Sequence, residues 1–319
     1  MMPDVSIDRD RLSPDGVTAA TASGAPVQTR AARLRAFWGD FCRAPVAVVS
    51  LVVIILLAVV SFGAPWVSPQ DPYDMAALDW LDAFLKPGTV GAGGYTHWLG
   101  TDNVGRDMLS AIFYGLRTSF VIGISAGVLA LALGICVGLS AAYVGGRLES
   151  LLMRIVDLQL SMPAILLALV LVAMLGQGVG QIILALVVAQ YAYFARTTHG
   201  AATVERGKDY IEAARSTPLP ARRVVFRHLL PNVLPPLIVV ATVQVASAIA
   251  LEATLSFLGV GLPLTEPSLG SLISNGFKYI HTDRTWLSIY PGVFLMITVV
   301  AINLVGDQVR HVLDPRNQR

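Results

Sequence analysis

The chain has 319 residues, of which 55% are hydrophobic and 14% are charged, and its formal net charge is +2. Soluble domains carry about a quarter charged residues, so this composition and the mean hydropathy of +0.65 exclude an ordinary soluble domain. The high hydrophobicity also excludes a chain that is disordered throughout, and the near-neutral charge implies no nucleic-acid partner. We therefore expect an integral membrane protein.

The chain opens with a polar segment, residues 1–43, which we expect to be a largely disordered tail. Residues 1–29 are rich in Asp, Ser, Thr, Ala and Pro and hold few large apolar side chains. The segment is too long for the short charged region of a cleavable signal, so the first apolar run should remain as an anchor.

Six apolar runs follow, and a helix needs about 20 such residues to cross a bilayer. The runs are Ala44–Phe62, Thr118–Val144, Leu158–Leu175, Gln181–Ala195, Asn232–Leu258 and Trp286–Gly306. The amphipathic stretch Arg147–Asp157 extends the third run backwards, and the fourth has the length at which a buried or interfacial helix competes. The sequence thus predicts an all-α bundle of six transmembrane helices over residues 44–306, followed by a tail over 307–319.

Lys and Arg mark the loops that stay in the cytoplasm. They concentrate before the first run and between the fourth and fifth, at Arg30, Arg33, Arg35, Arg43, Arg196, Arg206, Lys208, Arg215, Arg222, Arg223 and Arg227. The segments 63–117, 176–180 and 259–285 should therefore face outside. Both termini are expected in the cytoplasm.

Motifs for catalysis or metal binding are absent from the sequence. None of the three lysines, Lys86, Lys208 and Lys278, lies in a phosphate-binding G-x-x-x-x-G-K-[ST] loop, and there is no H-E-x-x-H. Cys42 and Cys136 are far apart and suggest neither a disulfide framework nor a metal site. We predict no catalytic residue, no metal and no cofactor in this chain, so any ATP hydrolysis must occur in another subunit.

A few residues inside the runs suggest packing or transport. Gly134 and Gly138 form G-x-x-x-G, which fits a partner-helix interface and packing within the chain equally well. Glu252 is an acid in an apolar run, so it should face the bundle interior or a partner, with either a pathway or gating role or a structural hydrogen bond. Gln244 is a further pathway candidate that packing would equally explain.

The basic loop 205–227 is the most informative segment. Helix-forming residues run from 205 to 215, prolines at 218 and 220 break that helix, and a second short helix can begin near Ala221. Charge alone favours an amphipathic element on lipid headgroups. The small pair Ala213-Ala214 beside Glu212 favours a docking element for a cytosolic protein.

At this loop the sequence resembles a known family. Glu212-Ala213-Ala214, with His228 and Leu230-Pro231-Asn232, is similar to the EAA loop of binding-protein-dependent ABC importers. Leu99, Gly100, Thr101 and Asp102, with Gly105, Arg106 and Asp107, resemble the L-G-T-D-x-x-G-R-D motif of the peptide and nickel branch. Leu255–Gly259 and Leu313–Arg316 match as well. The resemblance covers about residues 40–316 and is typical of the second, C-type permease of dipeptide and oligopeptide importers.

The resemblance implies a type I ABC importer permease fold with a cytoplasmic coupling helix, in a bacterial inner membrane. It implies a homologous second permease, two ABC ATPase subunits or domains that bind ATP and Mg, and an extracytoplasmic binding protein. The cargo would be a dipeptide, an oligopeptide or a related solute such as an opine, glutathione or a nickel complex. The ATPase-coupling residues would be Glu212, Ala213, Ala214, Arg215, Pro218 and His228.

Two points stay open at the level of sequence. Pro218 stands where the family usually has Gly, so the turn between the two short helices must be built differently. A self-sufficient secondary transporter or channel is the alternative function, although it would normally carry several embedded ionisable groups.

For segment 97–117 we expect a capped outer helix. Asp102 or Asn103 would serve as its cap, and Asp102 and Arg106 would pair at i, i+4. This helix would brace the outer mouth or contact the binding protein.

Overall fold

A computed structural model describes residues 30–74, 78–211, 220, 223–263 and 265–313. The chain divides into two compact units, Met1–Gly39 and Asp40–Arg319. Helix α1, Arg30–Cys42, begins in the first unit. All further description concerns the second unit.

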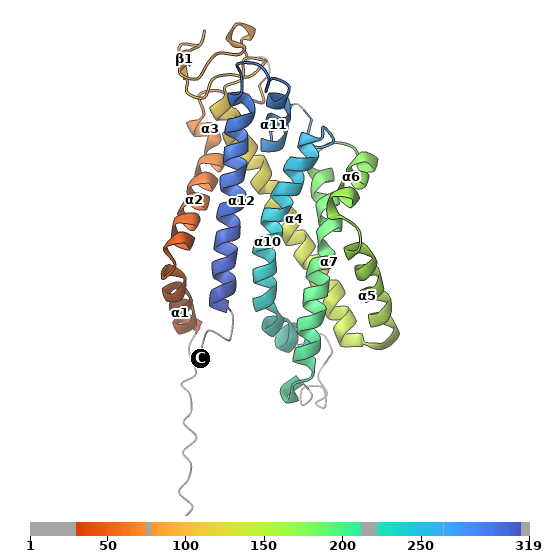
Figure 1. Cartoon of the computed structure of the whole chain (residues 1–319). Helices are drawn as coiled ribbons and strands as arrows, with labels where there is room; N and C mark the ends of the chain where they lie inside the picture. The colour runs from red at the N-terminus through yellow and green to blue at the C-terminus, as the bar shows by residue number, and fades with distance from the viewer. Residues whose placement is uncertain (1–29, 75–77, 212–219, 221–222, 264, 314–319) are drawn as a thin grey trace, which may run out of the picture. The chain divides into compact units, whose positions relative to one another are not determined.

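The second unit is helical, apart from a short hairpin (Figure 1). Its helices are α2 Pro45–Phe62, α3 Ala64–Val67, η3 Trp80–Asp82, α4 Met108–Val144, α5 Gly146–Leu160, α6 Ala164–Leu175, α7 Val179–Arg206, η4 Val224–Leu229, α10 Leu230–Phe257, α11 Leu269–Phe277 and α12 Trp286–Leu313. The strands β1 Thr89–Val90 and β2 Thr96–His97 pair antiparallel.

Within the described residues, five helices are long and apolar enough to cross a membrane: α2, α4, α7, η4 with α10, and α12. The helices α5 and α6 pass the same test only together, and they are bent by 92°. The prediction of one continuous span over Leu158–Leu175 is therefore wrong. Pro163 lacks an N–H and disfavours helical backbone at the residue before it, so the chain turns at residues 161–163. Six spans result only when the bent pair is counted as one.

Several helices extend beyond their predicted bounds. Helix α4 begins at Met108, so the last part of the predicted outer loop 63–117, residues 108–117, is helical, and α7 is 28 residues long where 181–195 was predicted. Helix α12 continues to Leu313, which makes the first part of the predicted tail 307–319 helical. Apolar runs indicate only the part of a helix that fits a bilayer, whereas backbone hydrogen bonding continues into polar sequence.

Helices α4 and α7 share the most extensive contact in the bundle. A Cβ on Gly134 would meet Phe194 and the carbonyl of Tyr191, and one on Gly138 would meet Thr198 and the carbonyl of Ala195. Small residues let two backbones approach closely. The G-x-x-x-G motif, which left two explanations open, therefore packs within this chain.

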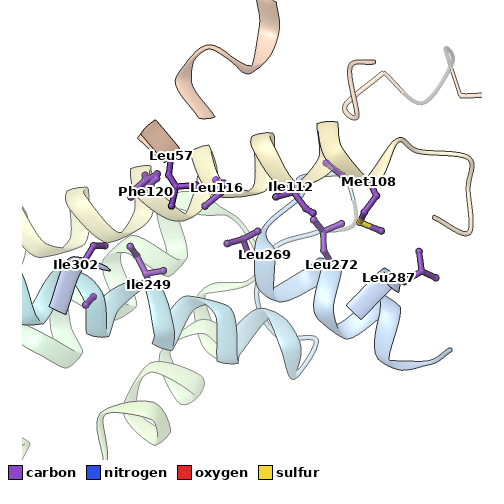
Figure 2. Packing of buried hydrophobic residues seen from close by; sticks show 12 residues of the cluster. Leu57, Met108, Ile112, Leu116, Phe120, Ile249, Leu269, Leu272, Leu287 and Ile302 are labelled. Carbon is purple, nitrogen blue, oxygen red and sulfur yellow. The ribbon is translucent and has the colours of Figure 1, made fainter. Parts of the chain in front are cut away.

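A hydrophobic cluster joins five helices (Figure 2). Buried side chains of α4 meet residues from α2, α10, α11 and α12; the labelled members are Leu57, Met108, Ile112, Leu116, Phe120, Ile249, Leu269, Leu272, Leu287 and Ile302. In a bilayer such close van der Waals packing is what holds helices together, so the cluster ties these five helices to one another.

We call the end of the bundle that carries the hairpin the hairpin end; among the described residues it comprises 63–74, 78–107, 258–263 and 265–285, including α3, the hairpin and α11 (Figure 1). The opposite end comprises Gly145, residues 206–211 and 223–229, and the end of α12 at Leu313. These two ends hold most of the residues that the sequence singled out.

The contact between α4 and α7 predicts the effect of Gly138→Val. The added side chain would overlap Thr198 and the α7 backbone, and overpacking of this kind costs about 1–3 kcal/mol. Thermal unfolding of the purified protein should occur at a lower temperature. Gly200→Val is the matched control, because a Cβ at Gly200 of α7 meets no atom of another described element within 4 Å. Equal melting temperatures for the two variants would contradict the packing assigned to Gly138.

Candidate functional site

The motif over residues 99–107 forms a tight loop against residues 82–85. Thr101 donates its hydroxyl to the carbonyl of Asp82 and accepts the amide of Leu85 at 2.8 Å. The amide of Met108 donates to the carbonyl of Gly100 at 3.0 Å. The prediction of a capped helix over 97–117 is therefore wrong for its first part, since α4 begins only at Met108.

Asp102 organises this loop. Its Oδ1 accepts the amides of Val104 and Arg106, both at 2.9 Å, and its Oδ2 lies 4.0 Å from Arg106 Nε. The predicted proximity of Asp102 and Arg106 is confirmed, but it occurs on a turn instead of a helix. Burial raises the pKa of Asp102 above its usual range, and the nearby Arg106 charge opposes that shift.

The two glycines of the motif are required by backbone geometry. Gly100 and Gly105 have φ of 77° and 80°, in the left-handed region that favours glycine. A Cβ on Gly100 would meet the carbonyl of Leu85, and one on Gly105 would meet the carbonyl of Asp79. The positions of the two glycines in the motif therefore allow this loop to pack closely against the preceding residues 79–85.

Asp107 caps α4 and holds a buried histidine. Its Oδ2 accepts the amide and the hydroxyl of Ser110 at 2.8 and 2.7 Å, and its Oδ1 lies 2.9 Å from His97 Nδ1. His97 is fully buried, with its Nε2 3.9 Å from Asp82 Oδ2. Sequence reasoning missed this role of His97 and Asp82. Only the Asp107 cap had a local signal, an acid directly before an apolar helix.

Glu252 lies in the interior, as expected for an acid in an apolar run. It is fully buried, and its two carboxylate oxygens accept hydroxyls from Ser119 of α4 at 3.0 Å and from Ser256 at 2.8 Å. Ser268, the buried N-cap of α11, adds a side-chain hydrogen bond to the same carboxyl group. The acid therefore joins α4, α10 and α11.

Gln244 lines a groove on the other half of α10. The groove has a volume of about 860 Å³ and lies between α7, α10 and α12. Gln244 is 8% exposed, and its Nε2 is buried with no hydrogen-bond partner among the residues that the structure describes. The groove continues to Asp307 and Arg310 near the opposite end. Glu252 does not line it, so the structure separates the two pathway candidates.

The predicted coupling residues Glu212, Ala213, Ala214, Arg215 and Pro218 lie outside the described residues. His228 is described, and it lies half-buried in the π-helical turn η4 that leads into α10. Its carbonyl accepts the side-chain amide of Asn232 at 2.8 Å.

A chain of hydrogen bonds links the two flanks of this segment; we call it the clasp, formed by Glu205, Lys208, Tyr210 and Asn232. Tyr210 donates its hydroxyl to Glu205 and accepts the amide of Asn232 at 2.9 Å. Lys208 Nζ lies 2.7 Å from Glu205 Oε2. Burial and the Glu205 carboxylate raise the pKa of Tyr210 to about 12, so the phenol remains a donor at neutral pH.

The clasp connects the end of α7 to the start of α10 across 22 residues of sequence. Sequence reasoning had assigned Asn232 to a motif and had not considered Tyr210 or Glu205 as its partners. The tyrosine two residues before Glu212 and the asparagine directly after Pro231 were the available signals.

At the hairpin end, Asp107→Ala should release both the start of α4 and His97. Loss of a helix cap costs about 0.5–2 kcal/mol, and the buried histidine would lose its closest partner. Hydrogen exchange at residues 97–112 should become faster. Asp79→Ala is the control, because Asp79 caps only the three-residue helix η3 at an exposed turn; equal effects of the two variants would refute the anchoring role.

At the opposite end, Tyr210→Phe should open the clasp. A hydrogen bond of this kind contributes about 0.5–1.5 kcal/mol, so amides at 205–211 and 228–233 should exchange several-fold faster. Tyr191→Phe removes a hydroxyl from α7 outside the clasp and should leave these amides unchanged. Unchanged exchange in Tyr210→Phe would mean that the clasp does not hold the two helix ends.

Two family matches cover most of the chain. Residues 134–319 match the binding-protein-dependent transport system inner membrane component, and residues 33–87 match the N-terminal transmembrane domain of oligopeptide transport permease C. A solved structure of the MetNI methionine ABC transporter, in an inward-facing conformation, is similar in fold. Its TM-score is 0.53 at 24% identity, over 64% of this chain and 97% of that chain. The predicted type I permease fold is confirmed.

Full-length relatives are also similar in sequence. A putative peptide transport system permease protein of Brucella suis is 40% identical over 85% of this chain and 87% of that protein. The di/tripeptide permease DppC of Pseudomonas aeruginosa is 36% identical over 89% and 92%, and the dipeptide permease DppC of Escherichia coli is 38% identical over 89% and 93%. This chain therefore belongs to the family of inner membrane components of binding-protein-dependent transport systems.

Proposed function

We propose that this chain is a permease subunit of an ABC importer for di- or oligopeptides or related small solutes, and that it forms half of the translocation pathway. The observation that carries the proposal is the similarity to peptide permeases along almost the whole chain, which includes both the 99–107 motif and the flanks of the coupling segment. No motif for a second, self-sufficient transport mechanism accompanies it in the sequence.

The charge distribution supports an orientation in a bacterial inner membrane. The opposite end carries Arg206, Lys208, Arg223 and Arg227, whereas the hairpin end is rich in acids. By the positive-inside rule, the opposite end and both termini lie in the cytoplasm, and the hairpin end lies outside. The chain is then a multi-pass protein whose segment 44–306 is the permease domain.

The subunit works with partners. A homologous second permease completes the pathway, two ABC ATPase subunits or domains bind ATP and Mg, and an extracytoplasmic binding protein delivers the solute to the hairpin end. The sequence supports this division, because none of its three lysines lies in a phosphate-binding loop. The chain itself contributes positioning and gating, with no covalent step.

The coupling contact lies within 205–227. We propose that residues Glu212 to Arg215 enter a cleft on an ATPase subunit. Pro218 would determine the turn that follows them, and His228 lies in the segment that leads back into α10. The clasp supports this proposal, since it ties both flanks of the segment to the ends of α7 and α10. A displacement of the segment by the ATPase would then move the ends of α7 and α10 together.

At the hairpin end we propose a bracing role for residues 99–107, which are clamped onto residues 79–85. We propose that Glu252 acts in gating. Because its side chain is fully buried within this chain, it would act through the packing of α4, α10 and α11. Gln244 lies in a groove and is the better candidate for contact with the solute.

Ala213→Trp tests the coupling contact. The added indole changes no charge, so attachment to lipid should be barely disturbed, but a close-fitted protein cleft would reject it at a cost of about 1–3 kcal/mol. The affinity for the ATPase should fall roughly 5- to 150-fold. The readouts are co-purification of the ATPase and solute-stimulated ATP hydrolysis in the reconstituted complex.

Val204→Trp is the matched control, because Val204 is 71% exposed on α7 at the same end of the bundle. It should assemble and hydrolyse ATP like the wild type. Wild-type assembly and hydrolysis by Ala213→Trp, together with failed membrane integration after charge reversal at Arg222 and Arg223, would identify the segment as a lipid anchor and overturn the proposal.

A further inference from the structure

Arg206, the last residue of α7, caps the end of a different helix. Its Nη1 donates to the carbonyl of Ala142 at 2.6 Å, and Ala142 lies in the last turn of α4, which has no basic residue of its own. The last carbonyl groups of a helix have no partner within that helix, and a positive charge beside them is favourable. The guanidinium group of Arg206 therefore supplies α4 with both a hydrogen bond and a charge.

The turn between α4 and α5 packs against this guanidinium group. A Cβ on Gly145 would lie 3.3 Å from Arg206 Nη1 and 3.7 Å from Glu149 Oε2. Arg206 therefore lies beside the turn itself and close to the acid in the first turn of α5. Its side chain is half-buried there, so salt screens these contacts less than it screens contacts at an exposed surface.

Two ion pairs join α5 to α7 along the length of both helices. His199 Nε2 lies 2.7 Å from Glu149 Oε1, and Arg196 Nη2 lies 2.6 Å from Asp157 Oδ1. Both partners of the second pair are exposed, and exposed pairs contribute little. His199 precedes Arg206 by about two helical turns, so the two side chains lie on one face of α7. The firmer contacts between α7 and α5 are therefore those at the start of α5.

The residue directly before Arg206 belongs to the clasp. Glu205 accepts the hydroxyl of Tyr210, which accepts the amide of Asn232 at the start of α10. Neighbouring residues on a helix point about 100° apart, so Glu205 and Arg206 leave α7 in different directions. The last turn of α7 is thus bonded both to the flanks of the coupling segment and to the junction of α4 and α5.

We propose that Arg206 is a positioning residue, which transmits a displacement of the coupling segment to the junction of α4 and α5. The clasp moves the end of α7, and Arg206 moves the end of α4 and the start of α5 with it. The inference rests on the proposed coupling contact within 205–227. It extends the effect of that contact from α7 and α10 to two further helices.

Distances between spin labels in the assembled complex test this inference. Cys42 and Cys136 are exposed, so both are first changed to serine. One label is attached at Val46→Cys on α2, and the other at Ser150→Cys on α5 or Val204→Cys on α7; all three positions are exposed. The chain is reconstituted in lipid nanodiscs with its second permease and ATPases. Both distances are measured without nucleotide and with trapped ADP-vanadate, and import of di-alanine is measured in parallel in vesicles that also receive the binding protein.

Trapped nucleotide should shift both distances in the otherwise wild-type chain. In Arg206→Leu the shift at the α7 label should remain, and the shift at the α5 label should be largely lost. Import should fall roughly 2- to 30-fold, the range expected of a residue that modulates coupling between two sites. Arg206→Lys should restore the α5 shift, because one positively charged donor is sufficient for the Ala142 carbonyl. Arg154→Leu removes a positive charge from an exposed position on α5 and should leave both shifts unchanged.

Two results would show that Arg206 does not transmit the displacement. Shifts of wild-type size at both labels in Arg206→Leu, or equal losses at both labels, would overturn the inference and leave the proposed function standing. Arg206→Gln is prepared as a milder second variant and should reproduce the selective loss at the α5 label. Loss of assembly in all three Arg206 variants, the lysine variant included, would make the residue purely structural and would also overturn the inference.

The wild-type complex separates this inference from the proposed function. Import of di-alanine together with a nucleotide-driven shift at the α7 label but none at the α5 label would overturn the inference alone. Failure of the ATPases to bind the wild-type chain would overturn the proposed function, and the inference with it.

Discussion

The close approach of other elements to α4 is the constraint on which the rest of the bundle depends. Glycines along this 37-residue helix remove side chains at the points where α7, α10 and α11 approach it. Gly115 lies against the start of α11, Gly123 and Gly127 lie against α10, and Gly134 and Gly138 lie against α7. In a bilayer the hydrophobic effect does not draw helices together, so such close packing must do so. Packing against α4 therefore determines the positions of α7 and α10, the two helices whose ends carry the clasp.

The two ends of the bundle are stabilised by different means. At the hairpin end, buried acids hold loops, with Asp102 closing a turn and Asp107 joining the start of α4 to His97. At the opposite end, the clasp leaves Tyr210 and Asn232 partly exposed, where a partner could reach them. Exposed hydrogen bonds open more readily than buried ones. The hydrogen bonds of the clasp should therefore open more readily than those of Asp107 at the hairpin end.

The sequence predicted the membrane spans and the family well, because apolar runs and the residues around 99–107 and 212–232 are local signals. It predicted helix bounds poorly, since α4, α7 and α12 continue into polar segments where hydropathy gives no signal. The local sequence predicts a helix cap at Asp102, but left-handed backbone at Gly100 and Gly105 makes the segment a loop.

The contacts of the candidate sites were predicted least well. The pair of His97 and Asp107 and the clasp between Tyr210 and Asn232 join residues that a linear pattern does not connect. The groove around Gln244 depends on three helices packing at particular angles. Such sites follow from tertiary packing, and no periodicity in the sequence reports them.

The bend between α5 and α6 has a consequence for the backbone between them. Helix α6 has 12 residues and is about 18 Å long, which is well short of the roughly 30 Å hydrocarbon core. The backbone at residues 161–163 leaves the helical hydrogen-bonding pattern, and irregular backbone at membrane depth is tolerated only against protein or water. This turn satisfies its own backbone donors, because Ser161 N donates to the carbonyl of Asp157, Met162 N donates to that of Gln159, and Pro163 has no N–H. Two helices that are each too short to cross a bilayer can therefore follow one another at an angle without leaving a donor of the turn unpaired.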